Sequence, residues 1–236
     1  MNTQSSRNND RFSLSPMHTD QVLMLVILGG ACLVIALGVV FVVSRFTDAP
    51  SFSWAAVGAI APWYLAVISG WIMFVMVPIY VAHGRTRQAG FVEWMQTGVL
   101  LAVIGAAIMG VGYLIERGFY NLLGLEKGAE DIYFSISSGS IVMIFAHYML
   151  TFAVWFALGG FVGVSLYRFT DWGWISIPIA LATASLTGLW NFTGVSIFGF
   201  VRRLVPTVDT GLAVVVVVCL CYLTWRMVQD MSLRNP

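Results

Sequence analysis

Apolar residues in this sequence fall into six long runs, and most charged residues lie in the short segments between those runs. A helix of about 20 apolar residues is long enough to cross the hydrocarbon core of a bilayer. The pattern therefore predicts an all-α polytopic membrane protein with six transmembrane helices and short loops. We place the spans at residues 22–43, 54–82, 94–115, 140–167, 173–189 and 212–225.

The six spans leave little chain for anything else. Residues 1–21 are expected to form a cytoplasmic N-terminal segment, in which Ser15 followed by Pro16 is typical of a helix start and predicts a short interfacial helix. Residues 22–228 form the transmembrane domain, and residues 229–236 are a cytoplasmic tail. The composition agrees, because 59% of the 236 residues are hydrophobic and only 10% are charged.

The distribution of Lys and Arg predicts the orientation, because these residues are retained on the cytoplasmic side. The side with both termini carries Arg7, Arg11, Arg85, Arg87, Arg168, Arg226 and Arg234. The opposite side carries Arg45, Arg117, Lys127, Arg202 and Arg203. We therefore expect a multi-pass protein of the plasma (cytoplasmic) membrane with both termini in the cytoplasm.

Few ionisable residues fall inside the spans, where such residues commonly mark ion pathways. Only His147, and Glu93 at an edge, come close. This scarcity makes an ion-coupled carrier or channel the weaker hypothesis. His147 is interpreted as a hydrogen-bonded packing residue, with a haem ligand or a partner of a catalytic serine as alternatives.

The chain also lacks the residues for ATP hydrolysis or for a metal site. A phosphate-binding P-loop needs Gly-Lys followed by Ser or Thr, and the sole lysine, Lys127, is followed by Gly128. The three histidines are scattered and form no zinc-binding pattern. We expect no enzymatic activity and no cofactor or metal in this chain.

A basic turn between the second and third spans carries the most specific pattern. Gly84 and Arg87 form a Gly-x-x-Arg turn, and the fourth span is rich in glycine and closes on Tyr167 and Arg168 before Gly173. These stretches resemble the ABC-2 type (type V exporter) permease family, and the resemblance in span layout covers nearly the whole chain.

The resemblance implies a turn that couples the permease to a separate ATPase subunit, which would bind ATP and Mg. The residues at the matching positions are His83, Gly84, Arg85, Thr86, Arg87 and Phe91. Arg85 and Arg87 would contact that ATPase subunit, with charge aiding the encounter. The alternative is that these arginines only set the topology.

The segment between the fifth and sixth spans is longer than one span requires. The resembling family places short re-entrant helices here, on the outer side. The candidate re-entrant residues are Asn191, Thr193, Gly194, Ser196 and Gly199. A tilted helix with an interfacial tail is the alternative.

Small residues at four-residue spacing mark candidate helix interfaces, because they let two helices approach closely. These residues are Gly159, Gly163, Ala180, Ala184 and Gly188. They serve either packing within the chain or contact with a second permease copy or a homologous permease. Trp54, Trp63, Trp71 and Trp94 are interpreted as belts at the membrane surface.

Together these patterns predict the transmembrane subunit of an ATP-binding cassette exporter that works as a dimer in the lipid bilayer, with no nucleic-acid partner. The low charge favours a hydrophobic or amphipathic cargo. The alternatives are an ion-coupled carrier or channel, a small membrane enzyme, and a membrane scaffold or immunity protein without transport activity.

Overall fold

The computed structural model describes residues 27, 55–123, 141–169, 171–186 and 206–230, and these residues form helices and turns with no strand among them. The elements are α2 (Ala55–Trp71), the π-helix η2 (Ile72–Met76), α3 (Val77–Ala82), α4 (Arg87–Leu123), α5 (Ile141–Arg168), the 3-10 helix η3 (Gly173–Ile175), α6 (Ser176–Leu186) and α8 (Pro206–Gln229).

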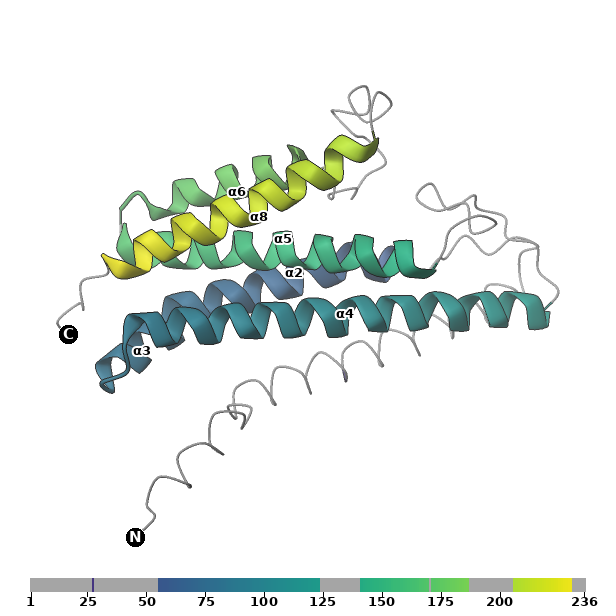
Figure 1. Cartoon of the computed structure of the whole chain (residues 1–236), viewed down its shortest axis with the longest axis horizontal. Coiled ribbons are helices and arrows are strands. Elements are labelled where there is room, and N and C mark those ends of the chain that lie inside the picture. Colours follow the sequence, from purple (N-terminus) through teal and green to yellow (C-terminus); the bar gives the residue numbers. More distant parts are fainter. Residues whose placement is uncertain (1–26, 28–54, 124–140, 170, 187–205, 231–236) are drawn as a thin grey trace, which may run out of the picture.

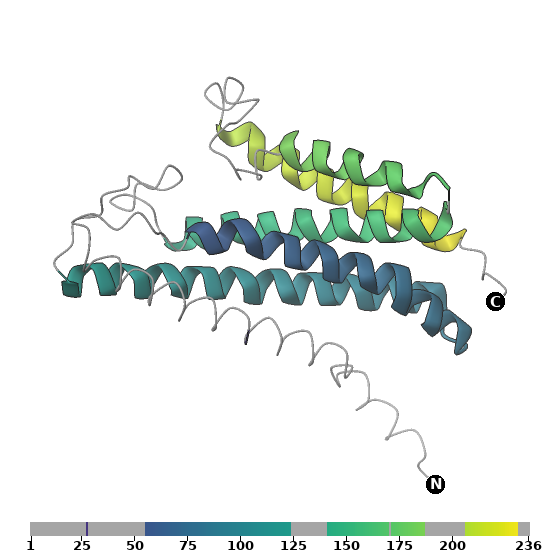
Figure 2. The ribbon, with the colours of Figure 1, turned by 180° about the vertical axis from the view of Figure 1, so that it is seen from behind.

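Helix α5 is the centre of the bundle (Figure 1) and packs against α2, α4, α6 and α8. Its most apolar stretch is 67% buried inside the protein, against 28% for the stretch that begins in α2 and 22% for that of α8. The side of the bundle that holds α2 faces the viewer in Figure 2. The other helices therefore use α5 as their common packing surface.

The turn after α3, the end of α5 and the end of α8 lie at one end of the bundle, on the left of Figure 1. Among the described residues, Arg85, Arg87, Arg168 and Arg226 belong to this end, whereas α4 carries Arg117 to the opposite end. The separation follows the predicted distribution of positive charge. We call the first of these ends the basic end.

Among the described residues, four helices are long and apolar enough to cross a membrane: Ile60–Ala82, Arg87–Ile115, Ile144–Arg168 and Gly211–Gln229. They match the second, third, fourth and sixth expected spans, so the prediction of an all-helical membrane protein is confirmed at this level. The expected first span lies outside the described residues, apart from Ile27. The number of six spans stays a prediction.

Two expected spans differ in length from the helices of the structure. Helix α4 begins at Arg87 rather than Trp94 and continues to Leu123, because polar residues at both ends remain helical although hydropathy detects only the apolar middle. Helix α8 likewise extends beyond the expected 212–225, from Pro206 to Gln229. Of the fifth expected span, the structure describes η3 followed by α6 as far as Leu186, and residues 187–189 lie outside the described residues.

Proline explains the π-helical segment between α2 and α3. Pro78 has no backbone N–H, and in a regular α-helix its ring would clash with the carbonyl group four residues earlier, at Phe74. The chain widens instead, and the Val77 N–H bonds to the carbonyl of Ile72, five residues earlier. The second expected span is therefore one helical rod with a local bulge near the basic end.

The backbones of α2 and α5 approach each other closely because glycines face the contact. A Cβ atom on Gly159 would lie 2.0 Å from the carbonyl oxygen of Ala66, and one on Gly163 would lie 2.2 Å from that of Gly70. Both helices advance by four residues in the same direction, so they run parallel. This is the contact that small residues at four-residue spacing permit in membranes.

We expect Gly163→Ala to destabilise the protein by about 1–3 kcal/mol, because the added methyl group forces the two backbones apart. Gly110→Ala in α4 is the matched control, since its Cβ would meet nothing within 4 Å. Thermal unfolding in mild detergent should show a lower Tm for the first variant only. Equal Tm values for both variants would contradict the close contact.

Candidate functional site

The turn between α3 and α4 is closed by three backbone hydrogen bonds. The N–H groups of residues 83, 84 and 85 donate to the carbonyl groups of Ile79, Val81 and Tyr80, at 3.0, 3.1 and 3.0 Å. Gly84 has a φ of 82°. This backbone conformation is unfavourable for any residue that carries a side chain. The glycine of the Gly-x-x-Arg pattern is thus required by the backbone of the turn.

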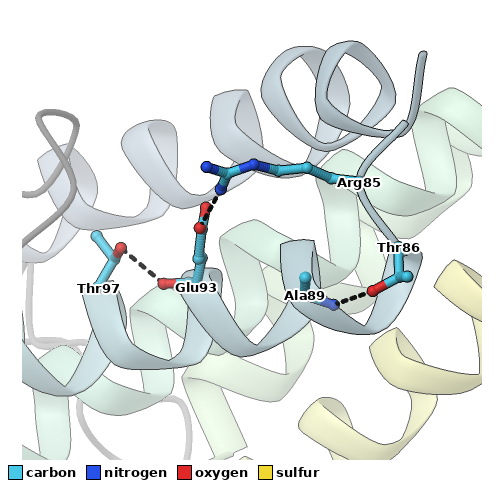
Figure 3. Close-up of polar contacts among 5 residues, drawn as sticks. All are labelled: Arg85, Thr86, Ala89, Glu93 and Thr97. Carbon is cyan, nitrogen blue, oxygen red and sulfur yellow. Dashed lines mark hydrogen bonds and ion pairs between the residues drawn. The ribbon is translucent and has the colours of Figure 1, made fainter. Parts of the chain in front are cut away.

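Thr86 starts the next helix. Its hydroxyl oxygen accepts a hydrogen bond of 3.1 Å from the Ala89 N–H (Figure 3), which is the arrangement of an N-cap residue. The Gly90 N–H donates to the Thr86 carbonyl at 3.2 Å. Residues 87–91 form the first turns of α4, so the turn continues directly into the following span.

Arg85 folds back over the start of α4 and pairs with Glu93 (Figure 3). The guanidinium group also lies 5.2 Å from the centre of the Tyr80 ring, on α3. The Glu93 side chain is only 20% exposed, and its Oε2 atom is buried without a hydrogen bond within the described residues. Arg85 therefore neutralises a largely buried carboxylate and joins the turn to α3 and α4.

Arg87 joins the same turn to α8. Its Nη1 donates to the carbonyl oxygen of Gln229, the last residue of α8. One residue further, Asp230 lies 3.5 Å from the Arg168 guanidinium at the end of α5. The ends of α5 and α8 and the start of α4 are thus connected through polar contacts.

Phe91 adds an apolar contact beneath the turn. Its ring centre lies 5.4 Å from that of Trp94 and 4.9 Å from that of Trp225 in α8. The six residues predicted for the coupling turn therefore lie together at the basic end. Residues 83–86 are exposed, and the side chains of Arg85, Arg87 and Phe91 also contact other helices of the chain.

A buried polar chain links α2, α4 and α5 deeper in the bundle. The Trp94 Nε1–H donates to the Ser69 hydroxyl oxygen at 2.8 Å, and the Ser69 hydroxyl donates to the Phe156 carbonyl at 2.5 Å. Trp94 is 1% exposed and stacks on Phe156 with ring centres 5.2 Å apart. The prediction that Trp94 belongs to a belt at the membrane surface is wrong, because the indole is buried and its N–H has a partner inside the bundle.

The other small residues of the predicted interfaces also pack inside the chain where they are described. Ala180 and Ala184 are buried in a cluster with Val154, Leu158 and Ala213. Gly188 lies outside the described residues, as do the candidate re-entrant residues Asn191, Thr193, Gly194, Ser196 and Gly199. The re-entrant segment stays a prediction.

His147 lies in α5 away from the turn. Its ring meets that of Tyr148 edge to face, with centres 5.4 Å apart, and its backbone carbonyl accepts a hydrogen bond from the Thr151 hydroxyl. In the part of the chain that the structure describes, no group of three or more His, Cys, Asp or Glu side chains is placed to hold a metal ion.

The sequence indicates the turn but not the groups that hold it. Glu93 stands at the edge of an apolar run, although its position eight residues after Arg85 places it on the second turn of α4. Gln229 acts through its backbone carbonyl, which no side-chain pattern can reveal. Ser69 is one hydroxyl in a long apolar run, and its partner Phe156 is 87 residues away.

The described helices place this chain among the helical membrane proteins by their length and composition. No family model matches the chain, and no curated protein or solved structure is significantly similar to it.

We expect Ser69→Ala to lower the free energy of unfolding by about 1–3 kcal/mol, because it leaves the buried Trp94 N–H without its acceptor. Thr183→Ala is the matched control, since the Thr183 hydroxyl donates an exposed hydrogen bond to the Ile179 carbonyl of its own helix. Reversible unfolding of each variant in mixed detergent micelles measures the difference. A Ser69 variant as stable as the control variant would contradict the role of this hydrogen bond.

Proposed function

We propose that this chain is the transmembrane subunit of an ATP-driven exporter of the ABC-2 type, moving a hydrophobic or amphipathic cargo. One observation carries the proposal: the exposed basic turn is braced to three helices at once. Its contacts run to α3 through Tyr80, to α4 through Glu93 and to α8 through the Gln229 carbonyl.

A braced turn is suited to receive force from a soluble partner. The sequence carries no P-loop, so in this proposal ATP and Mg bind in a separate ATPase subunit, and energy reaches the permease only by contact. The turn continues directly into α3 and α4, so its displacement moves both helices together. Polar contacts at the Gln229 carbonyl and at Asp230 extend that displacement to α8 and α5.

The exposed groups of the turn define the surface offered to the ATPase subunit. His83 and Gly84 are exposed, and the Arg85 side chain is 54% exposed even though it pairs with Glu93. Arg85 is thus placed to contact a partner on one side while it holds α4 on the other. Two copies, or one copy and a related permease, would enclose the pathway.

We expect Arg85→Glu to weaken the complex with the ATPase subunit about tenfold or more. In this proposal an acidic surface of the ATPase faces Arg85, and a like-charge contact there would reduce the binding free energy by more than about 1.4 kcal/mol. The full chain would be purified from its own membrane in mild detergent, and retained ATP hydrolysis would be measured. Arg226→Glu, an equal charge change on an exposed residue of the same end, should retain the ATPase.

Glu93→Gln separates the two roles of Arg85. It removes the ion pair within the chain but keeps the exposed guanidinium group, so the ATPase should stay bound. A chain that retains no ATPase, or one whose ATPase is insensitive to all three substitutions, would contradict the coupling role. Reconstituted vesicles that move only small hydrophilic ions would contradict the proposed cargo.

A further inference from the structure

An apolar groove of about 390 Å³ runs along α5, with α2 and η2 on one side and α6 on the other. Its walls include Trp63 and Val67 from α2, Phe74 from η2, Trp155 and Val162 from α5, and Leu181 from α6. Gly70, Gly159 and Gly163 also line it, at the contact between α2 and α5. The groove is distinct from the basic turn.

The groove is elongated along the helices that line it. Along α5 it extends from Trp155 to Leu166, and along α2 and η2 from Trp63 to Phe74. Eleven steps of about 1.5 Å give a length of roughly 16 Å in both cases. This length is close to one leaflet of the hydrocarbon core, which is about half of 30 Å.

The volume of the groove favours an occupant thinner than a helix. A helix of the same length and about 10–12 Å across occupies roughly 1,300 Å³ or more, so most of it would lie outside a groove of about 390 Å³. A single row of carbon atoms can lie along the groove and contact its walls at about 3.5–4.0 Å.

The chemistry of the walls excludes water as the occupant. A bound water molecule needs about 2–4 polar partners, and the lining side chains are apolar apart from three indole groups. Two of its walls, the stretch from α2 to η2 and helix α5, are long and apolar enough to span a membrane, and α6 is also apolar, so we expect hydrocarbon at the opening of the groove. An empty groove would lose the dispersion contacts of its walls.

We propose that this groove binds one acyl chain of a lipid-like amphiphile, which enters sideways from the bilayer, and that the cargo is of this chemical class. The statement that the bound acyl chain belongs to the cargo rests on the proposed exporter function, whereas the binding of an acyl chain in the groove does not. Phe74, a wall residue, belongs to the π-helical segment that continues through α3 to the basic turn. Movement of the turn therefore reaches the wall of the groove through one continuous rod.

The test is photolabelling of the full chain in phosphatidylcholine nanodiscs. A trace phospholipid with a diazirine in the middle of one acyl chain is added, the sample is irradiated, and the labelled residues are mapped by mass spectrometry. We expect labelling of Val67, Val162 and Leu181 to exceed severalfold that of Val99 and Val215. Those two are the controls, because both are exposed on the spans of α4 and α8 outside the groove.

Filling the groove gives the second measurement. Val67→Trp should reduce labelling of the α5 and α6 walls severalfold, and Val99→Trp should leave it unchanged. Both changes start from exposed valines, at 69% and 61% exposure. If Val67→Trp does not fold, Val162→Phe fills the same groove from α5.

Equal labelling of groove and control valines would overturn the proposal, as would covalent dimers formed through the groove residues, because a second copy would then be the occupant. The experiment uses neither ATP nor an ATPase. Groove labelling in a chain that binds no ATPase would therefore support the acyl-chain site while contradicting the exporter function.

Discussion

The close approach of the α2 and α5 backbones holds the centre of this bundle together. In a bilayer, lipid tails are as apolar as the helices, so helix association relies on close packing and hydrogen bonds. Gly159 and Gly163 leave no room for a side chain against the carbonyl groups of Ala66 and Gly70. The short distance between α2 and α5 brings the Ser69 hydroxyl to the Phe156 carbonyl. On α5, Gly160 likewise leaves room for the Trp94 ring of α4.

The same rod that makes this contact also reaches the surface. It continues from α2 through the π-helical bulge into α3 and ends at the basic turn. Its middle lines the apolar groove, and Tyr80 near its end lies beneath the Arg85 guanidinium. Because the turn is held to α4 and α8 as well, the polar end and the apolar groove belong to one mechanically connected unit.

The position of the site was predictable, but its internal contacts were not. Gly84 and Arg87 stand out in the sequence because they interrupt apolar runs, and the turn lies where they indicate. The sequence does not show that Arg85 neutralises Glu93 or that Arg87 bonds to a backbone carbonyl 142 residues away. Such contacts depend on the distance between helix ends. The burial of Trp94 was missed for a similar reason, since an indole suits a membrane surface equally well.

The apolar runs of the sequence are sufficient to predict a helical membrane protein and to locate the long helices among the described residues. Backbone groups in lipid must form hydrogen bonds within their own helix, so a long apolar run is expected to be helical. The packing of the helices settles which of them are neighbours, that α5 is central, and that a groove separates α2 from α6. Those outcomes depend on which helix faces carry small residues and on single hydrogen bonds between residues far apart in the chain. Apolar runs of similar hydropathy do not show which of their faces will meet or which polar groups will pair.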